Sequence, residues 1–373
     1  MLKFLIISYP HDAHPESVAW ALRRNGHEVV LLSFNDFCAY LSASISIDNT
    51  ACSLHFKHQG KLHAGLDQFD VVWLHRIGRA QLPDDLHAAD RELADREWIS
   101  FITAIPHFIS AKAFFANPIL GNQQSKSKAL QLQYARQIGL NIPRTLISND
   151  PQAVQNFFDA ENGAVIFKPF NFSTWIGEGK HYSTYTSPVR AEHLSAEKSI
   201  AACPGIYQQH IRKKYEVRAT IMGHECIAAR LMSQEHASTS TDWRAGAAGQ
   251  TIATDPFVLP AQIRGQCIAL MERLGIVFGC FDFMVTEDDE FVFLEVNEMG
   301  QFLWMEEDDP QFPLLDTFVK FLESRNPQFQ RGDAGVRHRY ADFRDSPEYV
   351  LHAQGDKNPS GHNVRRAQGV VTE

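Results

Sequence analysis

Cysteine and histidine motifs are nearly absent from this sequence. The six cysteines form no C-x-x-C pair, and the 17 histidines form neither an HExxH nor an HxH motif. A disulfide framework and a zinc site of a common type are therefore not expected. The apolar run near the N-terminus, within MLKFLIISYP, is too short for a signal peptide or a membrane span. We expect a cytoplasmic protein with reduced thiols.

Basic residues are too few and too scattered for nucleic-acid binding. The chain has 35 Lys and Arg against 44 Asp and Glu, a formal net charge of −9, and no long basic block. A nucleic-acid partner is therefore not expected. The remaining composition, 44% hydrophobic and 21% charged, is that of an ordinary globular protein, and 373 residues exceed one ordinary domain. We expect two or three packed units.

The first unit lacks glycine where a nucleotide-binding turn needs it. The pattern predicts a buried strand at Phe4–Ser8, a helix at Glu16–Asn25 and a second strand at Glu28–Ser33. This opening resembles a Rossmann unit, but the turn from Tyr9 to Pro15 contains no glycine. Without glycine the backbone cannot approach a pyrophosphate closely. We interpret residues 1–118 as a scaffold domain that binds no dinucleotide.

Turn signals and composition divide the rest of the chain. Residues 119–205 are predicted to form a central unit of helices and strands. Residues 206–325 are predicted to form a third unit, mostly strands, closed by a helix at Leu314–Ser324. From about 326 the chain turns polar, so residues 326–373 are expected to be a flexible tail, with docking by a few contacts as the alternative.

The most informative segment is an apolar hairpin in the third unit, FGCFDFMVTEDDEFVFLEVN. A two-residue loop at Asp288-Asp289 would pair Val285 with Val292. Counting back along both strands, this register brings one acid of each strand directly opposite the other.

Those two acids are Asp282 and Glu295, and Asn297 lies on the same strand face as Glu295. Two carboxylates and an amide form an all-oxygen set, which suits Mg²⁺ held jointly with nucleotide phosphates. The alternative is an edge hairpin with solvated acids, but both strands are too apolar to lie loosely on a surface. The residues therefore favour a metal site.

Three lysines of the central unit could bind an anion. Lys168 ends the apolar run VIF, so its ammonium leaves a strand at a loop and can bind phosphate. A lysine that only extends its charge to solvent is the alternative. Lys126 and Lys128, on the preceding predicted helix, could reach the same anion, although helical lysines are usually solvated.

Arginines gather on the strands of the third unit. We predict that the return over Gly223-His224 brings Arg230 beside Arg218, with Glu216 on the same face as Arg218. Two neighbouring buried arginines repel unless an anion lies between them, which favours a phosphate or acyl-phosphate clamp. Arg244, on a loop, is a further anion-binding candidate, with a solvated arginine as the alternative.

Taken in order, these segments resemble the ATP-grasp superfamily, and within it the microviridin-type peptide ligases, or graspetide synthetases. The matching stretches are VVWLHR, KALQLQYARQIGLNIPRTLISND, VIFKP, YQQHIRKKYEVRATIMG, DWR and FDFMVTEDDEFVFLEVNEMGQFLWMEE. The resemblance covers roughly residues 1–325. It implies an α/β (α+β) ATP-grasp fold with an N-terminal Rossmann-like pre-ATP-grasp domain, a small central lid domain and a C-terminal antiparallel-sheet domain.

The resemblance also implies roles for single residues. Mg²⁺ would be held by Asp282, Glu295 and Asn297, and the ATP phosphates by Lys168 with Lys128 or Lys126. The adenine would lie against Gln209, His210 and Ile211, with Glu216 also on the nucleotide side. The transferred phosphoryl group would be surrounded by Arg218, Arg230 and Arg244. The chain departs from the family at Asn297-Glu298-Met299, where Asn-Pro-Asn is common, and in a glycine-poor loop after Lys168.

The implied activity is that of an ATP-dependent carboxylate ligase. It would activate Asp or Glu side chains of a ribosomally made precursor peptide and form ester or amide crosslinks within that peptide. One alternative is a ligase that adds a free amino acid to a peptide or protein carboxylate. A second alternative is a catalytically silent ATP- or peptide-binding module. It is disfavoured because the predicted lysine, arginine and metal-binding residues named above are all present. A homodimer is left open, and no membrane partner is expected.

Overall fold

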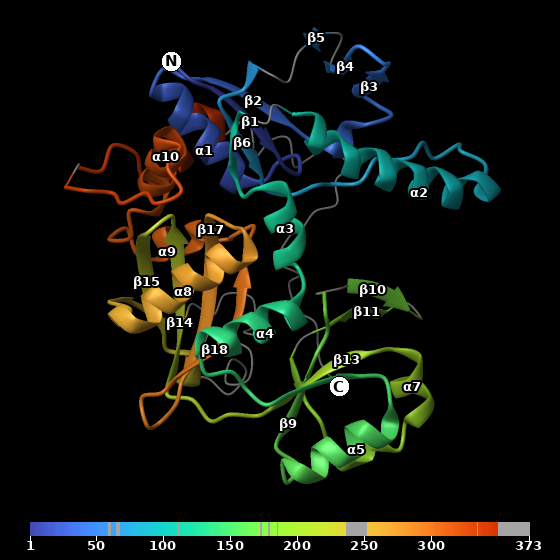
Figure 1. Ribbon diagram of the computed structural model, residues 1–373, viewed down its shortest axis with the longest axis vertical. Coiled ribbons are helices and arrows are strands. Elements are labelled where there is room, and N and C mark those ends of the chain that lie inside the picture. Colours follow the sequence, from blue (N-terminus) through green and yellow to red (C-terminus); the bar gives the residue numbers. More distant parts are fainter. Residues whose placement is uncertain are drawn as a thin grey trace.

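The computed structural model describes residues 1–58, 61–64, 68–109, 112–171, 174–177, 180–184, 186–235, 252–333 and 335–349. Within these ranges the strands form five sheets. Figure 1 shows the N-terminal unit at one end of the molecule, the sheet of the third unit in the middle and the central unit at the other end. None of the helices described is long and apolar enough to cross a membrane.

A parallel sheet of order β2-β1-β6-β7 lies at the centre of the N-terminal unit. Its strands are β1 (Lys3–Ile7), β2 (Glu28–Leu32), β6 (Val71–Leu74) and β7 (Phe114–Ala116). Helix α1 (Ala13–Arg24) packs on one face, which confirms the predicted strand-helix-strand opening. The other face packs against a second sheet and a long helix: β3 (Leu41–Ile47), β4 (Cys52–His58), β5 (Lys61–Ala64) and α2 (Ala88–Ala104). Strand β3 was not predicted.

The central unit has an antiparallel sheet of order β12-β9-β13-β8 and a separate hairpin, β10-β11. The strands are β8 (Thr145–Ser148), β9 (Val165–Lys168), β10 (Thr174–Gly177), β11 (Lys180–Ser183), β12 (Ser187–Pro188) and β13 (Gly205–Gln209). The helices are α5 (Pro151–Ala160), α6 (Ala191–Leu194) and α7 (Glu197–Ala202). Helix α5 starts where Asp150 accepts the N–H of Gln152, a common N-cap arrangement.

The third unit is built on an antiparallel sheet of order β16-β15-β14-β17-β18. Its strands are β14 (Tyr215–Met222), β15 (Glu225–Leu231), β16 (Thr254–Phe257), β17 (Phe278–Val285) and β18 (Phe291–Asn297). Two helices, α4 (Lys128–Ile138) and α8 (Ala261–Leu274), pack together on one face. Beyond the sheet lie α9 (Leu303–Asp308), α10 (Leu314–Ser324) and α11 (Tyr340–Arg344).

Helix α4 packs on the third unit although its sequence lies in the range predicted for the central one. Leu132 and Ala135 of α4 belong to the core formed by α8 and the five-stranded sheet. The preceding helix, α3 (Ile119–Ser125), crosses the end of α8 at very short range. A Cβ at Gly121 would lie 1.9 Å from the carbonyl oxygen of Gly275, so this crossing requires glycine. The predicted boundaries at 118, 205 and 325 stay a prediction.

Of the two alternatives given for the polar tail, docking by a few contacts is what the structure shows up to residue 349. Tyr340 and Phe343 of α11 are buried, and the Phe343 ring lies 5.9 Å from that of Trp20 in α1. The carboxylate of Glu306 accepts the backbone N–H groups of Leu315 and Tyr340, at 2.7 and 2.9 Å. This buried acceptor fixes the starts of α10 and α11. Together with the buried rings of Tyr340 and Phe343, it holds a largely polar segment against the rest of the protein. Residues 350–373 lie outside the described part.

We expect Phe343→Ala to lower the free energy of unfolding by about 3 kcal/mol, because it empties a buried aromatic site. Equilibrium unfolding in urea, followed by tryptophan fluorescence, measures the change. The matched control is Tyr40→Ala, because the Tyr40 side chain is 64% exposed. Equal, small effects of the two substitutions would show that the segment around α11 adds little to stability.

Candidate active site

Strands β17 and β18 bring Asp282 opposite Glu295, as predicted, but through a different register. Val285 pairs with Phe291, so the predicted pairing with Val292 and the two-residue loop are wrong. The turn is longer because Asp289 adopts a positive φ of 62°, which closes a wider loop. A β-bulge after Asp282 then shifts the register back by one residue. Bulges re-aim side chains, and this one places the two acids together.

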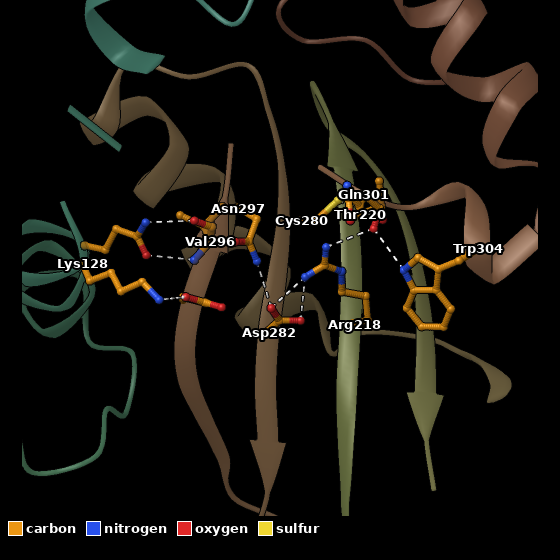
Figure 2. Close-up of polar contacts among 11 residues, drawn as sticks. Lys128, Arg218, Thr220, Cys280, Asp282, Val296, Asn297, Gln301 and Trp304 are labelled. Atoms are coloured by element: carbon orange, nitrogen blue, oxygen red, sulfur yellow. Dashed lines mark hydrogen bonds and ion pairs between the residues drawn. The ribbon is translucent and has the colours of Figure 1, made fainter. Parts of the chain in front are cut away.

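Asp282 lies at the centre of a polar network on the open face of the sheet (Figure 2). The guanidinium Nη1 of Arg218, on the adjacent strand β14, donates to both carboxylate oxygens at 2.8 and 2.7 Å. Nδ2 of Asn297 donates to the same carboxylate at 3.0 Å. Nη2 of Arg218 donates to the carbonyl of Gln301 at 3.1 Å. The Arg218 side chain is 6% exposed, so this ion pair is buried.

Glu295 pairs with a lysine of the preceding helix. Nζ of Lys128, at the start of α4, lies 2.8 Å from Oε2 of Glu295. The structure thus selects Lys128 over Lys126 as the lysine next to the acids. Helix α4 begins there because Ser127 accepts the N–H of Leu130, which sets the position of Lys128 in the first turn.

Two amide side chains that the sequence did not single out hold this region in place. Gln131 of α4 bonds both the N–H and the carbonyl of Val296, at 2.9 and 2.8 Å. Asn117 accepts the N–H of Phe278 and donates to the carbonyl of Glu298. Both are buried and link segments far apart in the chain, so no local pattern could have revealed them.

The residues predicted for the nucleotide lie at the junction of two sheets. Lys168 ends β9 opposite Ile206, whereas Gln209 ends β13 opposite Val165, at the other end of the same strand pair. The two are about 10 Å apart along the strands, a span that suits a nucleotide with adenine at one end and phosphates at the other. His210 and Ile211 follow directly and lead into β14. Burial lowers the pKa of His210, and the positive Lys213 acts in the same direction.

Comparison with protein-family models gives no match, and comparison with curated proteins gives none either. Solved structures do match. The macrocyclase MdnC of Microcystis aeruginosa MRC, bound with precursor peptide MdnA, is 28% identical, with a TM-score of 0.77 over 87% of this chain and 100% of that one. The chain has the ATP-grasp fold.

Two further ATP-grasp structures give the same result. The macrocyclase MdnB of Microcystis aeruginosa MRC is 25% identical, with a TM-score of 0.70 over 86% of this chain and 99% of that one. A RiPP-associated ATP-grasp ligase of Chryseobacterium gregarium, in complex with ADP and a leader and core peptide, is 24% identical. Its TM-score is 0.79, over 88% of this chain and 98% of that one. The predicted fold class is therefore confirmed.

One predicted element of the ATP-grasp site is wrong in its geometry: Arg230 does not lie beside Arg218. Met222 pairs with Glu225 across a two-residue turn, so Arg218 lies opposite Ala229 and Arg230 opposite Val217. Neighbours along a strand point to opposite faces, and one residue of register therefore moves Arg230 to the other face.

On that other face Arg230 has partners of its own. Its Nη2 donates to Asp255 at 2.8 Å, and its guanidinium lies 5.5 Å from the centre of the Tyr215 ring. A role for Arg230 toward phosphate stays a prediction that this geometry does not favour. Arg244 lies outside the described residues.

Burial controls the charges around the ATP-grasp site. For Arg218, burial has the largest single effect on the pKa and would lower it. The neighbouring negative groups, led by Asp282, together outweigh burial and raise the pKa above its ordinary value. Burial raises the pKa of Glu216, and Lys213 and Ser233 partly offset it through hydrogen bonds to the carboxylate. Glu216 therefore holds Lys213, two residues before β14 begins at Tyr215.

We expect Asp282→Asn to lower the free energy of unfolding by about 3 kcal/mol, because it leaves the buried Arg218 charge without its partner. Glu295→Gln is the matched control, since its partner Lys128 has a side chain 31% exposed and can be solvated. Urea unfolding of both variants, without nucleotide, gives the comparison. Equal effects would contradict the distinct roles of the two ion pairs.

Proposed function

We propose that this protein is an ATP-dependent ligase that activates carboxylates of a ribosomally made precursor peptide and forms ester or amide crosslinks within it. The observation that carries the proposal is the joint arrangement of Asp282, Glu295 and Asn297 with Arg218 and Lys128 on adjacent elements. The match to the macrocyclase MdnC, bound with its precursor peptide, supports this choice of substrate.

The donor set fits Mg²⁺ by its chemistry. Two carboxylates and an amide offer only oxygen ligands, the type that Mg²⁺ prefers when it also binds substrate phosphates. Asn297 uses Nδ2 toward Asp282, which leaves Oδ1 as an acceptor. Among the described residues no cluster of three or more His, Cys, Asp or Glu forms, so a metal held by acids alone is not indicated. When bound, Mg²⁺ would offset the negative charge of the phosphates.

The charges of the site are already balanced without a nucleotide. Arg218 neutralises Asp282, and Lys128 neutralises Glu295. A polyphosphate that enters such a site brings negative charge that these two cations alone cannot offset. This balance supports the joint use of ATP and Mg²⁺, with Lys168 on the neighbouring sheet as a further cation for the phosphates.

The chemistry has two steps, and phosphoryl transfer depends mainly on positioning and charge. A carboxylate oxygen of the peptide bonds to the γ-phosphorus while the bond to ADP breaks. A hydroxyl or amine of the peptide then attacks the acyl carbon, loses its proton and expels phosphate. Arg218 and Lys128 would stabilise the negative charge on the transferred group in both steps.

A ligase that adds a free amino acid to a carboxylate is the second candidate, because the same residues support that chemistry. We place the protein in the cytoplasm, where ATP is available and thiols stay reduced. This fits cysteines such as Cys267 and Cys280, which are buried and unpaired in the described structure.

We expect Glu295→Gln to reduce ATP turnover by about a thousandfold, because loss of one metal ligand removes several kcal/mol of transition-state stabilisation. ADP formation with Mg-ATP and the peptide encoded beside the gene measures the rate. Val258→Ala serves as the control, because Val258 is 90% exposed and far from these contacts in the sequence. Turnover of Glu295→Gln within about tenfold of wild type would refute the metal assignment.

The mass of the peptide product separates the two ligase reactions. Ring closure removes one water for each bond, whereas ligation of an amino acid adds the mass of that residue. We expect co-expression with the neighbouring precursor peptide to give a product lighter by whole waters, and no such loss with Asp282→Ala or Lys168→Ala. Mild alkali should restore one water for each ester and none for each amide. A heavier peptide would favour the second candidate.

A further inference from the structure

The loop between β18 and α9 contacts Arg218 through its backbone. Its Gln301 carbonyl accepts two hydrogen bonds, one from Nη2 of Arg218 at 3.1 Å and one from Nε1 of Trp304 at 3.0 Å (Figure 2). Nη1 of the same arginine is bonded to Asp282. The guanidinium is thus held at two points, and one of them is a backbone carbonyl whose place depends on the loop.

His14, from the N-terminal unit, holds this loop directly after Gln301. Its Nε2 accepts the backbone N–H groups of both Phe302 and Leu303, each at 3.1 Å. His14 lies in the first turn of α1, and its ring packs edge-on against the ring of Phe302. A residue of the predicted scaffold domain therefore contacts the loop of the candidate active site.

A second histidine holds the loop before Gln301. Nδ1 of His75, just after β6, lies 3.1 Å from the carbonyl of Met299. Nε2 of His75 lies 3.2 Å from Oδ2 of Asp12, and Oδ1 of Asp12 accepts the N–H of His14. The two histidines thus bind the loop on either side of the carbonyl that holds Arg218.

The two N–H groups require His14 to be neutral, since a protonated Nε2 has no lone pair to accept them. Burial lowers the pKa of His14 to about 3, although the charge of Asp12 acts to raise it. The other groups that act on the ring come from two further elements: His75 and Arg76 after β6, and Arg218 on β14. All three lower the pKa, so the ring remains an acceptor at neutral pH.

We propose that His14 is a positioning residue of the active site, which fixes the Gln301 carbonyl and, through it, the Arg218 guanidinium beside Asp282. The proposal deepens the ligase function proposed above and rests on it for the effect on rate. His14 does not contact the reacting atoms in this scheme. It acts only through the backbone of Phe302 and Leu303.

Three substitutions of His14 separate the effect of the hydrogen-bond acceptor from the effect of the side-chain volume. His14→Gln keeps an oxygen acceptor near the position of Nε2, and a glutamine does not titrate. His14→Leu keeps much of the volume without an acceptor, and the milder His14→Asn is too short to reach either N–H. The control is His27→Gln, because His27 also accepts a backbone N–H, from Leu2, and contacts Glu323 instead of the loop.

The first measurement is amide hydrogen exchange of the segment that contains Phe302 and Leu303. We expect exchange about tenfold faster in His14→Leu and His14→Asn, because the local opening no longer breaks two hydrogen bonds. In His14→Gln and His27→Gln the same segment should exchange at the wild-type rate. This readout needs neither ATP nor peptide, so it is independent of the ligase function.

The second measurement is ADP formation from Mg-ATP with the peptide encoded beside the gene. We expect kcat to fall about a hundredfold in His14→Leu and His14→Asn with little change in the KM for ATP, because a displaced catalytic group costs rate more than binding. His14→Gln should restore most of the rate. In the double variant with His14→Leu and Arg218→Lys, kcat should be little lower than with Arg218→Lys alone, because both substitutions act on one interaction.

The pH dependence of stability gives a third comparison. The pKa of His14 is about 3 when folded and 6.5 ordinarily, so the unfolded chain binds more protons between these values. The contribution of the neutral His14 ring to stability is therefore complete above pH 6.5 and is lost as the pH falls toward 3. The free energy of unfolding should fall less steeply over this range in His14→Gln than in wild type.

Unchanged loop exchange in both His14→Leu and His14→Asn would overturn the proposal. So would faster loop exchange with an unchanged rate of ADP formation, because the loop would then not position Arg218 for the reaction. A wild-type protein that forms no ADP with Mg-ATP and the peptide would instead overturn the ligase function, and with it the catalytic part of this proposal.

Discussion

Arg218 and Asp282 face each other across β14 and β17, and both are largely excluded from water. A buried charge without its partner costs several kcal/mol, so such a pair constrains all that surrounds it. Asn297 saturates one side of the carboxylate, and the Gln301 carbonyl saturates one side of the guanidinium. The register shift after Asp282 brings this acid opposite Glu295, and the loop after β18 supplies the Gln301 carbonyl to Arg218.

The sequence predicted most regular elements because their patterns are local. Helix α10 has the predicted bounds, and the paired acids of the hairpin were found. Long-range contacts are the part it could not supply. The hairpin turn was predicted one residue too short, and the bulge after Asp282 compensated for it. For Arg230 no bulge compensated, and an error of one residue in register changed the face of the sheet.

The N-terminal unit shows a similar limit of sequence reasoning. Its glycine-free turn from Tyr9 to Pro15 was interpreted as part of a scaffold that binds no dinucleotide. The same segment carries His14, which accepts the N–H groups of residues nearly three hundred positions away, at 302 and 303, and Asp12, which lies beside His75. No spacing rule links such positions. Only the folded chain shows that the N-terminal unit and the loop between β18 and α9 form one hydrogen-bonded network.

The docked C-terminal segment also affects the order in which the molecule can be made. One face of the first parallel sheet, with Phe4 and Trp73, shares a core with Phe318 of α10 and Phe343 of α11. The ribosome delivers the sheet first and these helices last. The part of this face that α1 does not cover therefore stays exposed while the 197 residues between β7 and α10, residues 117–313, are synthesised. This unit precedes the other two in the sequence, yet its core is complete only when the helices that follow them have been made.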